Sequence, residues 1–322
     1  MNYIGSKSSL LDFLYESIDS IVSEKNYQFS DLFAGTGAVG RHWKKKGHQV
    51  WANDLQYYSY VLNRNYIGNN RDLYFSWLIA DMPKLLNVKN IDTNTIVLSY
   101  LSSLKGEKWF LYQNYTLGGT RGREYERLYF SDENASKCDA IRMQIEEWKK
   151  SSKITEDEYF FLLTSLLEAI DKVANTASVY GAFLKKLKKS AEKSLELKAA
   201  TYHLSHHNHV VTHEDVWLLV AHTKHDVVYL DPPYNQRQYS GNYHILETIA
   251  RYDAPELHGK TGMRDCRNQK SDYCSRNQVK KAYKKLIEEI DANYIFLSYN
   301  DEWLMTLDDI REIMSSRWEY GV

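Results

Sequence analysis

The stretch Asp31-Leu-Phe-Ala-Gly-Thr-Gly-Ala-Val-Gly40 places glycines at positions 35, 37 and 40. It follows a strand-like run from Tyr27 and leads into a short basic helix that ends before Gly47. Glycines at a strand-to-helix turn let a ligand lie against the backbone. A turn of purely structural purpose is the alternative, but Asp54, roughly 20 positions further on, suits ribose hydroxyls and favours a ligand.

The carboxylate of Asp31 distinguishes this turn from a phosphate site, because a carboxylate repels phosphate and suits a cationic amino group. S-adenosylmethionine carries such a group together with a ribose. The loop residues Asp31, Phe33, Gly35 and Gly37 and the acidic Asp54 are therefore candidate cofactor contacts. A nicotinamide dehydrogenase is disfavoured, since no hydride-handling acid or base stands beside the glycine loop.

Alternating helices and strands surround this turn. Apolar spacing predicts helices over residues 8–25 and 55–66, and strands at 49–53, 209–212, 226–230 and 294–299. The pattern indicates an α/β fold with a doubly wound, mostly parallel sheet and a helical insertion. We expect residues 1–75 to form the cofactor-binding half of a catalytic domain, 76–200 a target-recognition insertion, and 201–322 the second catalytic half.

Composition excludes several classes of protein. The 322 residues have a formal net charge of −1 and are 43% hydrophobic, which argues against disorder and against a uniformly basic nucleic-acid coat. Three scattered cysteines supply neither a disulfide framework nor a metal knuckle, as expected in a reducing cytoplasm. No apolar run approaches the roughly 18 residues of a membrane span, so neither export nor a membrane partner is expected.

The tetrapeptide Asp231-Pro-Pro-Tyr234 follows an apolar strand and should lie at the carboxyl end of the sheet. Adjacent prolines stiffen the loop and leave the Pro232 carbonyl free to accept a hydrogen bond beside the Asp231 carboxylate. Two acceptors suit an exocyclic amino group, and Tyr234 offers a face for an aromatic ring. A merely rigid turn is the alternative. We interpret Asp231, Pro232, Pro233 and Tyr234 as catalytic residues of adenine amino chemistry.

Together these segments resemble DNA adenine-N6 methyltransferases of the Dam-like group. The order of parts agrees: Tyr3-Ile-Gly-Ser-Lys7 resembles their N-terminal cofactor motif, and the glycine loop, an insertion and the catalytic motif follow. The run 231–239, with Tyr243-His244 and Gly259-Lys-Thr-Gly262, looks closest to methyltransferases of type IIS restriction-modification systems. The resemblance covers roughly residues 1–70 and 200–300 and is weaker in the insertion.

This resemblance implies methyl transfer from S-adenosyl-L-methionine to N6 of a flipped-out adenine in duplex DNA, by a bacterial monomer paired with a cognate restriction endonuclease. It implies that Tyr3 and Lys7 contact the cofactor, Lys7 through the methionine carboxylate. Asp231 would lie beside both methyl donor and target. Glu214 or Asp215 would contact the cofactor adenine, and Ser298-Tyr-Asn300 would line the base pocket. An RNA or other amine methyltransferase, or a specificity subunit with a vestigial site, are the alternatives.

Basic segments supply the charge that DNA requires. Residues 260–285 hold nine Lys or Arg against two Asp, on a chain whose total is −1. Such a segment can neutralise phosphates, and arginines in the loop 118–123 match guanine in the major groove. A solvated helix face is an equal alternative for Lys281 to Lys285. The candidate DNA contacts are Arg121, Arg123, Arg237, Lys260, Arg264, Arg267 and Lys270.

Two further features of the sequence say little about function. Five histidines cluster between residues 203 and 213, but Val210-Val211 among them indicates a strand with alternating faces, so no metal site is expected. The run Trp318-Glu-Tyr-Gly-Val322 is strand-like and follows a helix, where the family's sheet is expected to continue. We expect that the sheet is either truncated there or completed by another chain.

Overall fold

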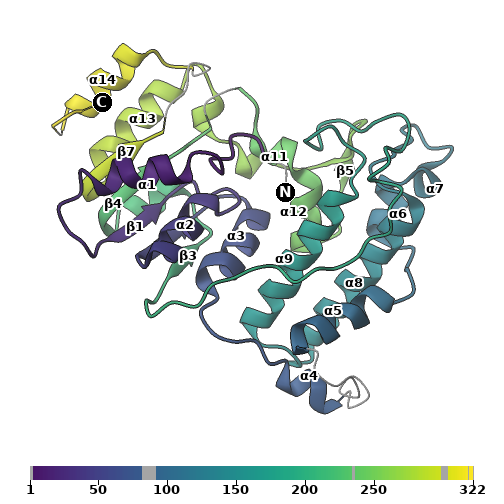
Figure 1. The fold of residues 1–322 in the computed structure, drawn as a ribbon. Coiled ribbons are helices and arrows are strands. Elements are labelled where there is room, and N and C mark those ends of the chain that lie inside the picture. The colour runs from purple at the N-terminus through teal and green to yellow at the C-terminus, as the bar shows by residue number, and fades with distance from the viewer. Residues whose placement is uncertain (1–2, 82–91, 234–235, 299–303, 318, 322) are drawn as a thin grey trace. The chain divides into compact units, whose positions relative to one another are not determined.

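The computed structural model describes residues 3–81, 92–233, 236–298, 304–317 and 319–321. The chain splits into two compact units, and Figure 1 labels most of their helices and strands. The sheet unit comprises Ser6–Asn63, Ser205–Asn242 and Cys266–Val322. The helical unit comprises Met1–Gly5, Arg64–Leu204 and Tyr243–Asp265.

Five parallel strands form the core of the sheet unit, in the order β3-β2-β1-β4-β7. They are β1 (Gln28–Asp31), β2 (Gln49–Asn53), β3 (Val210–Thr212), β4 (Lys224–Leu230) and β7 (Asp291–Leu297). The chain runs outward from β1 to β3 on one side and continues with β4 and β7 on the other. The strand order therefore reverses between β1 and β4, the point at which open α/β sheets bind ligands.

The register of β1 and β4 brings two predicted site residues to the same edge of the sheet. Asp31, the last residue of β1, pairs with Tyr229 of β4. Asp231 comes two residues after Tyr229 and so follows the neighbouring strand at its carboxyl end. The predicted doubly wound sheet is confirmed, and its reversal point lies where the two carboxylates were expected.

Helices cover both faces of the sheet, and the strands carry buried apolar side chains on both, as is usual for a parallel sheet. Val228 and Leu230 pack with the helices of one face, whereas Phe29 of β1 stacks on Trp43 of the other at 4.0 Å between ring centroids. The helices of the first face are α10 (Val216–Val220), α13 (Val279–Glu289) and α14 (Leu307–Ser315). The unit also contains α1 (Leu11–Asp19), α2 (Ala38–Lys46), α3 (Tyr57–Asn63), α11 (Tyr239–Asn242) and the 3₁₀ turns η3 (Arg267–Gln269) and η4 (Asp272–Cys274).

The helical unit is built around α9 (Glu156–Lys172), whose aromatic and leucine side chains are buried on nearly every side. A helix that is apolar all round requires neighbours all round. Among its neighbours is α8 (Asp132–Lys150), which is capped by Ser131. The unit also contains the π-helix η1 (Arg64–Gly68), α4 (Ser76–Asp81), α5 (Thr93–Ser103), α6 (Phe110–Tyr115), α7 (Leu117–Thr120), α12 (His244–Arg251) and the antiparallel pair β5 (Leu257–His258) and β6 (Met263–Arg264).

Candidate active site

Asp31 and Asp231 are the two carboxylates at the point where the strand order reverses. Asp31 is 1% exposed, and its Oδ1 atom has no hydrogen-bond partner among the described residues. Lys7 Nζ lies 2.7 and 2.8 Å from the two carboxylate oxygens of Asp231. Burial raises the pKa of Asp231, and Lys7 partly offsets that rise. Burial, and then the charges of Asp231 and Asp54, raise the pKa of Asp31 to about 8.

The pairing of Lys7 with Asp231 joins residues that are 224 positions apart, so no local spacing could reveal it. The resemblance implied that Lys7 contacts the methionine carboxylate of the cofactor, and in the structure its ammonium group pairs with Asp231, the predicted catalytic carboxylate. An opposite charge at this distance favours the ionised form of a buried acid. Lys7 therefore lowers the pKa of Asp231 against the effect of burial and favours its ionised, accepting form.

The glycine loop is held by hydrogen bonds to its backbone. Gly35 and Gly37 have φ angles of 51° and 75°, which residues with a side chain rarely adopt. Gly37 is the N-cap residue of α2. The Asp54 carboxylate accepts hydrogen bonds from the backbone N–H groups of Gly35 and Gln56, both at 2.8 Å. Asp54 thus orders the loop as well as standing at the predicted ribose position.

Two residues that support this loop were missed by the sequence analysis. Ser59 donates its hydroxyl to the Gly35 carbonyl, and Asn63 donates its amide to the same oxygen at 3.1 Å. Both side chains lie on α3 four residues apart, and both are buried. The signal in the sequence was a pair of polar residues at helical spacing on a helix that otherwise buries apolar ones.

Phe33 and Asp215 lie in different settings. The Phe33 ring meets Tyr273 edge to face, with 5.2 Å between centroids, and is partly buried. Asp215 is exposed and caps α10 by accepting from Trp217 N at 3.0 Å. Glu214 is also exposed, and its backbone N–H donates to Asn53 Oδ1 at 3.2 Å. Both acidic side chains thus reach solvent, and the geometry favours neither as the adenine contact.

The catalytic motif is described in part. Pro232 is buried and Pro233 is partly exposed, while Tyr234 lies outside the described residues. In the base pocket predicted at Ser298-Tyr-Asn300, only Ser298 is described, and its backbone N–H donates to the Leu230 carbonyl at 2.9 Å. At the end of the chain, Trp318 and Val322 also lie outside the described residues.

The segment after the catalytic motif is clamped by the segment 266–274. Gln238 exchanges two hydrogen bonds with the backbone of Ser271: its amide donates to the carbonyl at 3.1 Å, and its oxygen accepts from the N–H at 2.8 Å. The Cys274 thiol donates to the Arg237 carbonyl at 3.4 Å. Sequence reasoning missed this clamp, because nothing in the spacing pairs residues 33 positions apart.

Tyr3 belongs to the helical unit. Its ring stacks on Tyr243 with 4.8 Å between centroids and 22° between planes. The Ile4 backbone N–H donates to the Tyr243 hydroxyl at 2.9 Å, which ties this segment to the residue before α12. The ring therefore has an aromatic partner within its own unit.

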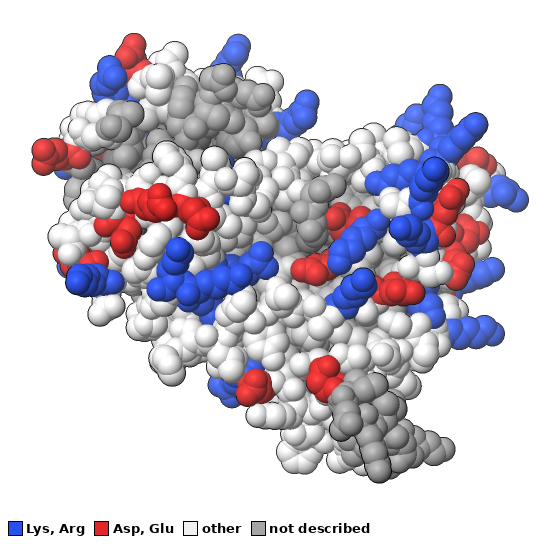
Figure 2. Space-filling view, viewed as in Figure 1, with Lys and Arg blue, Asp and Glu red and all other residues white. Residues whose placement is uncertain are grey.

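The candidate DNA contacts differ in exposure. Most are exposed: Arg121, Arg123 and Lys260 in the helical unit, and Arg237, Arg267 and Lys270 in the sheet unit. Arg264 is the exception. Its side chain is 9% exposed, and its guanidinium group makes a bidentate ion pair with the Asp253 carboxylate. Figure 2 shows lysine and arginine side chains gathered, with acidic ones between them, over the part of the helical unit that carries α6 and α7.

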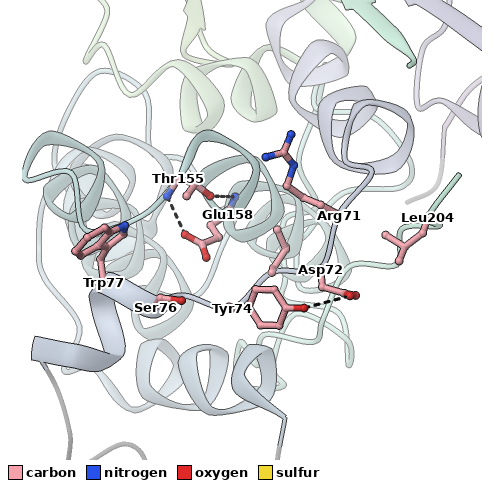
Figure 3. A pocket seen from close by; sticks show the side chains of 9 residues that line it. Arg71, Asp72, Tyr74, Ser76, Trp77, Thr155, Glu158 and Leu204 are labelled. Carbon is pink, nitrogen blue, oxygen red and sulfur yellow. Dashed lines mark hydrogen bonds between the residues drawn. The ribbon is translucent and has the colours of Figure 1, made fainter. Parts of the chain in front are cut away.

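A pocket of about 450 Å³ lies in the helical unit (Figure 3). It is lined by Arg71, Asp72, Leu73, Tyr74, Ser76, Trp77, Thr155, Glu158 and Leu204. Thr155 and Glu158 bond to each other as the capping box of α9, and the Tyr74 hydroxyl donates to Asp72 at 3.4 Å. None of the predicted site residues lines this pocket, and its acidic groups are engaged in local structure.

Among the described residues, no group of three or more His, Cys, Asp or Glu side chains could hold a metal ion. Two histidines of the 203–213 cluster make structural contacts: His209 Nδ1 accepts from Val50 N at 3.1 Å, and His213 Nε2 lies 3.0 Å from the Leu55 carbonyl. No helix in the described part of the chain is long and apolar enough to cross a membrane.

Comparisons with known proteins identify the family of this chain. The family described as D12 class N6 adenine-specific DNA methyltransferase matches residues 3–313. The type II methyltransferase M.NlaIII of Neisseria lactamica is 47% identical over 324 residues, covering the whole of this chain and 90% of that protein.

Two other relatives differ in length. M.FokI, a type II methyltransferase of Planomicrobium okeanokoites, is 40% identical over 321 residues, which span 98% of this chain and 47% of M.FokI. M.CviAII of Paramecium bursaria Chlorella virus 1, also a type II methyltransferase, is 33% identical over 327 residues, which span 100% of this chain and 89% of the relative. No solved structure matches the chain.

Proposed function

This chain belongs to the D12 class of N6 adenine-specific DNA methyltransferases, enzymes of restriction-modification systems that use S-adenosyl-L-methionine, and we propose that its target adenine is turned out of duplex DNA. The observation that carries the proposal is the pair of carboxylates at the strand-order reversal, of which Asp31 is buried and Asp231 partly buried. Asp31 has an unpartnered oxygen there, and Asp231 is paired with Lys7.

The residues at this site fit the cofactor. The unpartnered, buried Oδ1 atom of Asp31 suits a cationic amino group. The turn at Gly35 and Gly37 leaves the backbone open to a close approach, and Asp54 stands where a ribose is bound in related folds. When bound, S-adenosylmethionine supplies an electrophilic methyl group on its sulfonium. Lys7 lies in the same site. Its ammonium group has three donors, so it can bind the methionine carboxylate while it is paired with Asp231.

Asp231 and the Pro232 carbonyl are the groups that act on the adenine. The lone pair of adenine N6 is delocalised into the ring, so the nitrogen is a poor nucleophile. Hydrogen bonds from the N6 amino group to these two acceptors localise the lone pair and aim it. Lys7 contributes by holding Asp231 in its ionised, accepting form.

Turning the base out of the duplex costs a few kcal/mol. Stacking of the adenine on Tyr234 offsets much of that cost, at about 1–3 kcal/mol. Exposed basic residues supply the DNA-facing charge: Arg121, Arg123 and Lys260 in the helical unit, Arg237, Arg267 and Lys270 in the sheet unit. The helical unit, which includes the whole range 76–200 of the predicted insertion, is our candidate for target recognition.

The biological setting follows from this activity. We propose that the enzyme acts as a monomer on DNA, because one chain supplies both cofactor and target contacts. It would protect host DNA against a cognate endonuclease of the same specificity. Its place would be the bacterial cytoplasm, where that DNA and the cofactor are found.

Asp231→Ala tests the catalytic assignment. Labelled methyl groups from S-adenosylmethionine should appear as N6-methyladenine in duplex DNA with the wild type. We expect the variant to lose at least about 100-fold in kcat, the size of effect seen when a donor or acceptor aimed at the reacting group is removed. Binding of cofactor and DNA should persist in part. Unchanged turnover in Asp231→Ala, or labelling of RNA alone by the wild type, would contradict the proposal.

A further inference from the structure

Two loops of the helical unit carry exposed basic residues. The arginine loop, residues 121–126, follows α7 and holds the exposed Arg121 and Arg123. The hairpin loop, residues 259–262, joins β5 to β6 and holds the exposed Lys260. The loops are more than 130 residues apart in sequence, and neither has regular structure of its own. Their common placement therefore needs a tertiary contact.

The side chain of Arg127, which is 8% exposed, supplies that contact. Its guanidinium group donates to three backbone carbonyls: Nη2 to Gly259 at 2.9 Å, Nε to Lys260 at 3.1 Å and Nη1 to Asn114 at 3.2 Å. A planar group with donors in a fixed fork can serve all three at once, and no other side chain has that geometry.

The backbone of Arg127 is held just as firmly on the side of the arginine loop. Its N–H donates to the Thr120 hydroxyl at 2.8 Å, so the residue closes the loop that starts at the end of α7. Within the loop, Gly122 N donates to the Glu126 carboxylate at 2.9 Å. That acidic group is thereby engaged locally, and the two arginines remain exposed.

The hairpin loop also contacts Tyr115 and Arg127 through Gly262. The Tyr115 hydroxyl donates to the Gly262 carbonyl at 2.8 Å. Gly262 has a φ angle of 65°, and a Cβ there would lie 2.9 Å from Nε and 3.0 Å from Cζ of Arg127. A side chain at this position would therefore require the guanidinium group to shift.

We propose that Arg127 is a positioning residue that fixes the arginine loop and the hairpin loop as one surface for duplex DNA. This inference rests on the proposed DNA contacts of Arg121, Arg123 and Lys260. The chemistry divides their tasks: arginines can pair in bidentate fashion with guanine in the major groove, whereas a lysine binds phosphate as a point charge. Arg127 itself is buried and does not touch DNA. It sets the distance between the two arginines that read bases and the lysine that binds phosphate.

The glycines of the hairpin loop offer a matched test. Gly262→Ala and Gly259→Ala both put a side chain at a φ of 65°, but a Cβ at Gly259 meets nothing within 4 Å. Only Gly262→Ala therefore pushes on Arg127. Arg127→Lys is the second variant, because it keeps the charge but loses the fork. The measurement is kcat/KM for a duplex with the methylation site, mapped from wild-type product, against the same duplex with one neighbouring base pair changed.

We expect Gly262→Ala and Arg127→Lys each to reduce this discrimination by about tenfold, within the range that one bidentate base contact supplies. Gly259→Ala should discriminate as the wild type does, and cofactor affinity and melting temperature report whether each variant is folded. If Arg127→Lys does not fold, the glycine pair decides alone. Wild-type discrimination in Gly262→Ala, or equal losses in both glycine variants, would overturn the inference.

Arg121→Ala with Arg123→Ala separates this inference from the proposed function. If that double variant discriminates as the wild type does, the proposed DNA contacts fail, and the positioning role fails with them. If the double variant loses discrimination but Gly262→Ala keeps it, the DNA contacts stand and Arg127 is not their positioning residue.

Discussion

At the scale of single residues, Asp31 is a buried carboxyl group with a pKa of about 8, raised by burial and by Asp231 and Asp54. Near neutral pH most of it is protonated, so it must lose a proton before it can pair with a cationic amino group. We expect the affinity for S-adenosylmethionine to rise by up to about tenfold per pH unit between about pH 6 and 7.5, with proton release. Calorimetry in two buffers of different ionisation enthalpy measures the affinity and the number of protons released. The Asp31→Asn variant should lose both the pH dependence and the proton release.

The same carboxyl gives a second readout of that prediction. Its folded-state pKa lies above the unfolded value of about 3.9, so the folded chain binds more protons between about pH 4 and 8. Its contribution to the free energy of unfolding therefore falls as the pH rises through that window. Urea titrations at several pH values should show a slope that Asp31→Asn lacks. Identical slopes in wild type and variant would contradict the assignment.

Single residues also show what sequence can and cannot predict about the site. Asp31, Asp54 and Asp231 could be placed because each lies at or just after the end of a strand, and the carboxyl ends of parallel strands share one edge. The pairing of Lys7 with Asp231 could not, because it depends on where a remote segment returns in space. Local patterns predict local geometry, and charge pairing belongs to the tertiary fold.

At the scale of elements, the clamp between Gln238 and Ser271 holds the segment that follows the catalytic motif. Gln238→Ala removes both hydrogen bonds. We expect kcat to fall by about tenfold or more, because small misplacements of reacting groups are costly. The KM for duplex DNA and the affinity for cofactor should stay near wild type, because the Gln238 side chain bonds to Ser271 and is not among the proposed DNA or cofactor contacts. Steady-state kinetics and equilibrium binding measure these.

A conservative variant separates positioning from stability in this clamp. Gln238→Glu keeps an oxygen for the Ser271 N–H but loses the donor to its carbonyl, so kcat should lie between those of wild type and Gln238→Ala. If both variants lower only the melting temperature and leave kcat unchanged, the clamp is purely structural.

Elements with strong local signals were predicted almost to the residue. The helix Ala38–Lys46 has glycines at both ends, with Gly47 in the left-handed region that ends many helices, and the strand Gln49–Asn53 follows directly. The helix predicted over residues 55–66 instead is α3 followed by the π-helix Arg64–Gly68. There the Asn69 N–H bonds to the Arg64 carbonyl, five residues back, a widening that side-chain periodicity does not encode.

At the scale of the whole molecule, sequence order and spatial grouping diverge. Residues 243–265 follow the catalytic motif in sequence, but they cluster with the helical unit through contacts such as Arg142 with the Ile249 and Ala250 carbonyls. Arg142 donates to these carbonyls at 2.9 and 3.1 Å near the end of α12. A buried arginine on one helix that satisfies the last turn of another is typical of tertiary capping, which no linear pattern announces.

Charge is the whole-molecule property on which DNA binding depends, and a net charge of −1 conceals how it is distributed. Arg237, Arg267 and Lys270 are exposed in the sheet unit. If each neutralises one phosphate, replacing all three by alanine should reduce the slope of log affinity against log salt by about 3, at roughly 0.9 per contact. Fluorescence anisotropy of a labelled duplex between about 50 and 200 mM salt measures that slope.

The lysines of α13 provide the control, because their charge is partly balanced along the helix. Lys284 and Lys285 lie 4.0 and 3.7 Å from Glu288 and Glu289, one turn further on. Replacing Lys281, Lys284 and Lys285 by alanine removes the same formal charge as the first triple variant but should leave the slope unchanged. Equal slopes in the two triple variants would mean that DNA senses only the total charge. A smaller slope in the α13 variant alone would move the DNA contact to that helix.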